Sequence, residues 1–214
     1  MNFIEKVVET IKNPKSTMKN IAEQPMIEEA VIIVGVLAIL SALGAYVRSY
    51  TLIINVENMP PSMQSIIAVT GVIFALIGPF LMWLIVTGIL HFISMILSGE
   101  GKFYPQMMTV VGYSMVPLFF SGLISIIFLL MMEPTTITVS ATNPTAVNEI
   151  YNNPYVIGSS IIGTIMQVWA SVILFFGVQS AHRLTPIKSA TVAGIPLAIN
   201  IISLVWSLRS IGII

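Results

Sequence analysis

The chain has 214 residues, of which 56% are hydrophobic and 8% are charged, and its mean hydropathy is +0.96. Soluble domains carry about 25% charged residues, so this composition excludes a water-soluble globular protein and predicts an all-α integral membrane protein. The 9 basic and 9 acidic residues cancel, which excludes nucleic acid as a partner. The absence of cysteine excludes disulfides and thiolate sites.

Residues 1–26 are amphipathic, and we predict that they form a cytoplasmic preamble to the membrane domain. Asn13-Pro14 divides the segment into two short helices, because proline cannot continue a helix. The pattern favours helices lying at the interface of an anionic membrane; short helices packed on the rest of the protein are the alternative. The apolar positions of the first helix are Phe3, Ile4, Val7, Val8 and Ile11, and the lysines of the segment are Lys6, Lys12, Lys15 and Lys19.

Long apolar runs predict five transmembrane helices in a single domain, residues 27–214. Each run has roughly 18 residues or more, which is enough to cross a hydrocarbon core about 30 Å thick. We expect kinks in the second, third and fifth helices at Pro79, Pro117 and Pro196. The predicted helices cover about 30–47, 66–97, 105–132, 156–181 and 190–208, with loops at 48–65 and 133–156 and turns at 98–104 and 182–188.

The basic residues predict the orientation of the chain. With the N-terminus in the cytoplasm, seven of the nine lysines and arginines fall on the cytoplasmic side and only Arg48 and Arg209 fall outside. This asymmetry is typical of cytoplasmic segments. We therefore expect an odd number of spans, a C-terminus outside, and, for a prokaryotic protein, a location in the plasma membrane. The residues counted inside are Lys6, Lys12, Lys15, Lys19, Lys102, Arg183 and Lys188.

The sequence predicts no catalytic residue, no cofactor and no metal site. Every glutamate falls in a loop or at the end of a span, and proton- or sodium-coupled carriers usually hold such groups deep in the membrane. The two histidines, His91 and His182, each lie near the cytoplasmic end of a span. A pH-sensing or metal-binding pair is one interpretation. The other, which we favour, is a histidine at a helix C-terminus, where the helix dipole favours it.

Four short motifs follow one another in a recognisable order. Asn13-Pro14-Lys15-Ser16-Thr17-Met18 precedes the first span. Gly99-Glu100-Gly101-Lys102-Phe103 is a charged turn in which we expect the glycines to supply positive φ. Gly112-Tyr113-Ser114 with Pro117 follows within the third span. Trp169, His182-Arg183-Leu184, Lys188 and Pro196 mark the last hairpin. Together these motifs resemble those of the Yip-domain family, the Ypt/Rab-interacting multi-pass membrane proteins.

The resemblance implies a non-enzymatic protein with five spans. Eukaryotic relatives are linked to vesicle trafficking and to small Rab-type GTPases, so family analogy alone implies a small GTPase as a partner. The preamble here is short compared with those relatives, which indicates a compact prokaryotic member. The partners that we expect are the lipid bilayer and other membrane proteins or further copies of the chain.

We therefore predict a protein that acts in membrane organisation or protein interaction at the cytoplasmic face. The alternative is a small permease or channel for a solute or lipid, in which the kinked helices and Gln106, Gln167, Gln179 and Asn200 line a polar path. The residues expected to carry the interaction or the shape of the domain are Gly99, Gly101, Lys102, Phe103, Gly112, Tyr113, Pro117, Trp169, His182, Lys188 and Pro196.

Overall fold

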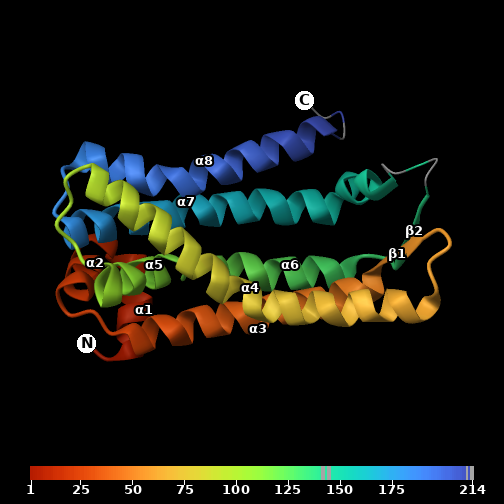
Figure 1. Ribbon diagram of the computed structural model, residues 1–214, viewed down its shortest axis with the longest axis horizontal. Coiled ribbons are helices and arrows are strands. Elements are labelled where there is room, and N and C mark those ends of the chain that lie inside the picture. The colour runs from red at the N-terminus through yellow and green to blue at the C-terminus, as the bar shows by residue number, and fades with distance from the viewer. Residues whose placement is uncertain (141–142, 144–145, 211, 213–214) are drawn as a thin grey trace.

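A computed structural model describes residues 1–140, 143, 146–210 and 212 of the chain. The predicted loop 133–156 and the predicted domain 27–214 include residues 141–142, 144–145, 211 and 213–214, which lie outside the described part. Helices run lengthwise through the molecule, and the chain crosses repeatedly between its two ends (Figure 1). The prediction of an all-α membrane protein is confirmed.

Four helices are long and apolar enough to cross a membrane, and a bent helix pair makes the number up to five. The pair is bent by 42° at a break between its two parts. Residues 115–117 form that break, and Pro117 explains it because proline has no N–H and its ring clashes with the preceding turn. The four helices are α3 (Ile27–Thr51), α4 (Pro61–Ile96), α7 (Pro154–His182) and α8 (Pro186–Ser210), and the bent pair consists of η1 (Phe103–Met107) with α5 (Met108–Ser114), and α6 (Leu118–Met131).

The helices α1 (Phe3–Lys12) and α2 (Pro14–Glu23) form at the predicted positions. A reciprocal capping box starts α1: the Asn2 side chain accepts from the Glu5 N–H, and the Glu5 carboxylate accepts from the Asn2 N–H. Pro14 then starts α2 in the position where its missing N–H costs least. Both helices pack on the membrane helices, and α2 buries Met18, Ile21 and Ala22 mainly against α7. The interpretation as packed helices therefore applies, while a position at the lipid interface stays a prediction, as does the domain boundary after residue 26.

The face of α1 that packs differs from the predicted one. Lys6 and Thr10 are buried, whereas Ile4 and Val8 are exposed. The prediction that Lys6 lies on the exposed polar side of an amphipathic helix, opposite the apolar positions, was wrong. Helical spacing still describes the contact, because positions 3, 6, 7 and 10 lie on one side of a helix.

Two short strands at the far end were not predicted. The strands β1 (Leu52–Val56) and β2 (Thr135–Val139) pair in parallel, with Leu52 opposite Thr135 and Val56 opposite Val139. Both are rich in β-branched residues, which favour strands. The 3₁₀ helix η2 (Ala146–Asn152) covers them, and together they enclose a small apolar cluster around Ile137 and Ile150.

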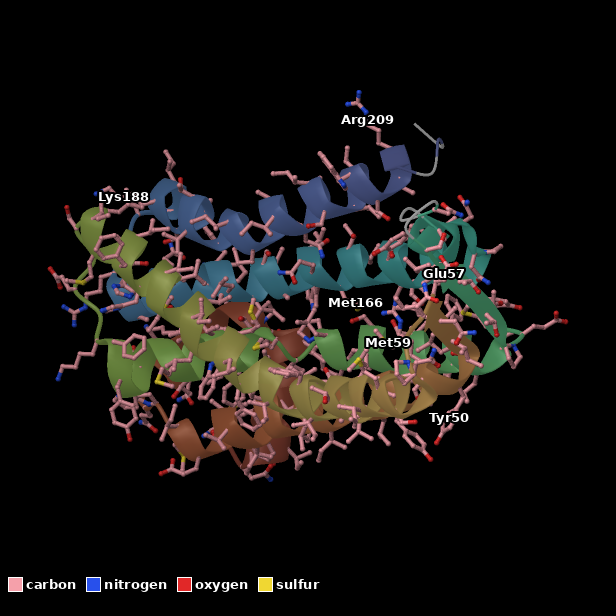
Figure 2. All side chains as sticks on the ribbon, turned by 45° about the vertical axis from the view of Figure 1, so that its right-hand side comes forward. Tyr50, Glu57, Met59, Met166, Lys188 and Arg209 are labelled. Carbon is pink, nitrogen blue, oxygen red and sulfur yellow. The ribbon has the colours of Figure 1, made fainter. Side chains whose placement is uncertain are left out.

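The main buried core lies at the opposite end, near the N-terminus (Figure 1). Elsewhere α3, α4, α6 and α8 expose large apolar side chains, as helices facing lipid do. α4 runs along α3 and then crosses toward α8, and Pro79 lies within it (Figure 1). Lys188 lies at the end that carries the N-terminus, whereas Tyr50, Glu57 and Arg209 lie at the other (Figure 2). The geometry thus places the three predicted cytoplasmic segments at one end.

Candidate interaction site at the interlocked turns

His182 joins the two turns that sequence analysis singled out, 98–104 and 182–188. It ends α7 and is fully buried. Its Nδ1 accepts a hydrogen bond of 3.2 Å from the Gly101 N–H, and its Nε2 lies 3.2 Å from Nδ1 of His91. Because a backbone N–H only donates, a neutral His182 carries its proton on Nε2 and donates it to His91. The histidines therefore pair with each other across 91 residues of sequence.

Among the described residues, the histidine pair lacks a third side chain of the kind that binds metal. Within the described residues, no group of three His, Cys, Asp or Glu side chains could hold a metal ion. The rings of His91 and Phe103 lie in an edge-type contact, with centroids 5.6 Å apart. The pair thus serves as a polar contact inside the packed end of the molecule.

Glycine is required at positions 99 and 101 because the two turns approach each other closely there. A Cβ atom on Gly101 would lie 2.5 Å from the Ala181 carbonyl oxygen, and one on Gly99 would lie 2.7 Å from His182 Nδ1. The expected positive φ was wrong for both glycines; the residue with positive φ in this turn is Ser98, at 69°. The glycines let one turn press against the backbone of the other.

Three further contacts hold the turns together. The Glu100 N–H donates to the His182 carbonyl at 3.1 Å, and the exposed Arg183 guanidinium lies 3.3 Å from the Glu100 carboxylate. Nζ of Lys188 donates to the Leu97 carbonyl at 2.7 Å, at the C-terminal end of α4. A cation there both satisfies a terminal carbonyl and complements the helix dipole.

Replacing Lys188 tests this cap. We expect Lys188→Met to destabilise the protein by about 1–2 kcal/mol, because the Leu97 carbonyl loses a charged donor. Lys188→Arg is expected to retain most of the stability, since its guanidinium can still donate. Thermal unfolding in detergent measures both. Equal melting temperatures for the Met variant and the unmodified protein would contradict the proposed role.

A second cluster lies beside the turns and contains Gly112 and Tyr113. A Cβ on Gly112 would lie 2.7 Å from the Ala30 Cβ, so α5 packs closely on α3. Tyr113 is fully buried, and its hydroxyl donates to the Glu29 carboxylate at 2.5 Å. Nζ of Lys6 reaches both oxygens of that carboxylate, at 2.9 and 2.8 Å. A charged pair with a hydroxyl donor therefore joins α1, α3 and α5 in the interior.

Sequence reasoning missed this network. Glu29 was predicted only as one of the glutamates in a loop or at the end of a span, and Lys6 only as one of the cytoplasmic lysines. Both are less than 10% exposed. The available signal was Lys6 lying on the same helical side as Phe3, Val7 and Thr10. Buried charges are rarely left unpaired, but spacing does not tell which carboxylate pairs with Lys6.

The other predicted residues have separate positions. Lys102 is exposed, and its N–H donates to Gln106, whose side chain donates to the Ala22 carbonyl of α2. Trp169 lies half-exposed on α7, away from the turns. Pro117 forms the bend between α5 and α6, and Pro196 lies inside α8 and lines a small cavity with Trp83. The fold thus brings Gly99, Gly101, Phe103, His182 and Lys188 together and leaves Trp169, Pro117 and Pro196 outside that contact.

A family of known proteins matches almost the whole chain. The model of the Yip1 domain family matches residues 8–207. An uncharacterized protein of the archaeon Methanocaldococcus jannaschii is 33% identical over 124 residues, which span 56% of this chain and 85% of that relative. No solved structure matches the chain. The resemblance inferred from the motifs is confirmed, and the chain belongs to the Yip1 domain family of membrane proteins.

Proposed function

We propose that the protein is a non-enzymatic membrane protein that binds another membrane protein, or a further copy of itself, at the cytoplasmic face. The proposal rests on the end of the molecule where the turns 98–104 and 182–188 contact each other. Segments from three distant parts of the sequence meet there through polar contacts that are partly or fully buried. Such contacts fix a surface that a partner can recognise without reordering it.

The exposed part of this end supplies the recognition surface in our proposal. Tyr104 is 62% exposed beside the exposed Lys102, and Glu100 and Arg183 lie on the surface of the same turns. Aromatic and basic side chains of this kind are enriched in protein interfaces. The positive-inside asymmetry supports a cytoplasmic position for the surface. By analogy with the family, a small GTPase would be one partner for this surface.

Site-specific photo-crosslinking tests the proposal. A photoreactive residue at Tyr104 in native membranes is expected to give a discrete crosslinked product, at twice the 23.3 kDa chain mass if the partner is a second copy. The control is the same residue at Trp206, which is 76% exposed near the other end of the bundle. No discrete product at residue 104, or identical products at both positions, would contradict the proposal.

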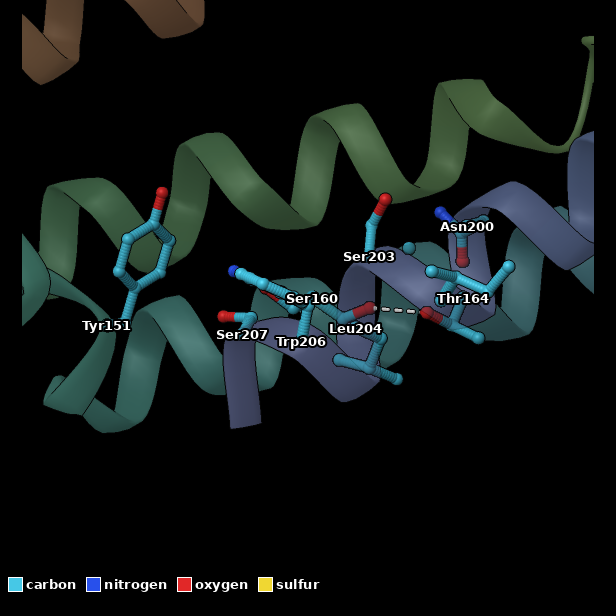
Figure 3. A pocket seen from close by; sticks show the side chains of 10 residues that line it. Tyr151, Ser160, Thr164, Asn200, Ser203, Leu204, Trp206 and Ser207 are labelled. Atoms are coloured by element: carbon cyan, nitrogen blue, oxygen red, sulfur yellow. Dashed lines mark hydrogen bonds between the residues drawn. The ribbon is translucent and has the colours of Figure 1, made fainter. Parts of the chain in front are cut away.

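Three neighbouring cavities between the helices support a second candidate function, a small permease or channel. The first cavity, of about 540 Å³, lies between α7 and α8, and its lining includes the polar side chains of Ser160, Thr164, Asn200 and Ser203 (Figure 3). It shares Asn200 and Gly163 with a cavity of about 630 Å³ that reaches Pro79.

The second cavity also borders a third. The amide of Asn200 lies where the first and second cavities meet. The third cavity, of about 190 Å³, shares Gln167 with the second and reaches Pro196 and Trp83. The buried Oδ1 of Asn200 has no hydrogen-bond partner among the described residues. An unpaired amide oxygen is costly in an apolar medium, so it favours a hydrogen-bond donor in the cavity. Gln106, by contrast, donates to the Ala22 carbonyl.

Flux through reconstituted vesicles tests this candidate. If it is correct, vesicles that contain the protein move solute or lipid faster than empty vesicles, and Asn200→Leu removes the difference. Asn200→Leu is expected to be as stable as the unmodified protein, because it removes a buried amide oxygen that has no hydrogen-bond partner among the described residues. Flux equal to that of empty vesicles, or flux unchanged by Asn200→Leu, would reject the path.

A further inference from the structure

A basic cavity lies where α1 meets α2, beside α7. Its volume is about 620 Å³, and Phe176 of α7 contributes its apolar part. Three of the other six lining residues are lysines. The lining residues are Lys12, Asn13, Pro14, Lys15, Ser16, Lys19 and Phe176.

The positive charge of this cavity is largely uncompensated. No carboxylate lines it, and Lys12 and Lys15 form no ion pair with any described residue. Lys19 lies 3.9 Å from Glu23, but both side chains are more than 60% exposed, so water screens that pair. The nearby Glu9 accepts a hydrogen bond from Asn13. The cavity therefore favours an anion.

The place of the cavity along α7 matches the depth expected for lipid headgroups if α7 spans the bilayer. Phe176 is six residues before the end of α7 at His182, which is about 9 Å along the helix axis. Its neighbour Gly177 packs directly on α2, since a Cβ there would lie 2.6 Å from Met18. The lysines thus stand at the end of a membrane helix, while Phe176 reaches toward the hydrocarbon region.

We propose that this cavity binds the phosphate headgroup of an anionic phospholipid, with an acyl chain of that lipid lying along Phe176. Lysine ammonium groups are good point-charge partners for phosphate, and an apolar wall beside them suits a lipid better than a free anion. The lipid would fix the position of α1 and α2 against α7. Lipid retention and crosslinking at residue 104 are separate measurements, so the lipid site and the proposed interaction surface can each be refuted without the other.

Native mass spectrometry of the full chain tests the site. The protein is released from nanodiscs with equal amounts of phosphatidylglycerol and phosphatidylcholine carrying the same acyl chains. The unmodified protein is expected to retain phosphatidylglycerol in preference to phosphatidylcholine. The triple variant Lys12→Gln, Lys15→Gln and Lys19→Gln is expected to lose this preference by on the order of tenfold, because each lysine attracts the anionic lipid.

Two matched variants separate the site from total charge. The corresponding triple arginine variant keeps the charge and should keep the preference, whereas Arg209→Gln removes a charge at the other end and should leave it unchanged. A normal melting temperature for each variant confirms folding. The proposal is overturned if the triple glutamine variant retains the preference, if Arg209→Gln abolishes it, or if glycerol 1-phosphate without acyl chains binds as well as the lipid.

Discussion

Glu29→Gln is expected to lower the melting temperature in detergent by on the order of 10 °C. The variant keeps the shape of the side chain but leaves Lys6 charged in the interior without its counter-charge. Breaking a buried pair by removing one partner typically costs about 3–5 kcal/mol, and a chain of this size loses about 2–4 °C per kcal/mol. Lys6→Met is expected to destabilise the protein similarly, because it strands the Glu29 carboxylate.

The double variant Lys6→Met with Glu29→Gln distinguishes a charge effect from lost packing. It removes both charges and still offers Tyr113 an oxygen acceptor. We expect its stability to lie within about 2 kcal/mol of the unmodified protein, since a buried ion pair contributes little net stability over neutral partners. A double variant as unstable as the sum of the two single variants would show that the charges do not act as a pair.

Gly101→Ala is expected to destabilise the interlocked turns by about 3 kcal/mol. The added methyl group would meet the carbonyl oxygen of Ala181 at 2.5 Å. That oxygen belongs to backbone and cannot rotate away, so the turns must separate and weaken the Gly101–His182 hydrogen bond. Thermal unfolding measures the loss of stability, and crosslinking at Tyr104 should fall with it if the ordered turn forms the interaction surface.

Gly88→Ala is the matched control for that substitution. Gly88 lies in α4, near His91, and a Cβ there would meet nothing within 4 Å. Alanine is the better helix former by about 1 kcal/mol, so this variant should be as stable as the unmodified protein or more so. Similar losses for Gly88→Ala and Gly101→Ala would show that the close approach of the turns is not the cause.

Much of the fold follows from local sequence. Hydropathy predicts the long helices because each must be apolar along its length, and Pro117 predicts the break in the third span. The N-terminal helices follow from their periodicity and from Asn13-Pro14. These features depend on neighbours within a few residues, which a sequence displays directly.

Pairing across long distances could not be predicted in this way. His91 and His182 are 91 residues apart, and Tyr113 lies 84 residues from Glu29. Nothing in their local sequence specifies the partner. The parallel pair β1 and β2 likewise depends on α3 and α6 ending side by side. Lys6 was misplaced because Phe3, Val7 and Ile11 fit either of two neighbouring helix faces.

We propose that α1, α2 and the two turns form one ordered surface on the cytoplasmic side. The chain has no cysteine, so single cysteines at Lys15, Glu57 and Lys102 can be labelled without background. With a membrane-impermeant maleimide, we predict that position 57 reacts in intact cells, and that positions 15 and 102 react only after permeabilisation. Labelling of positions 15 and 102 in intact cells would contradict the account.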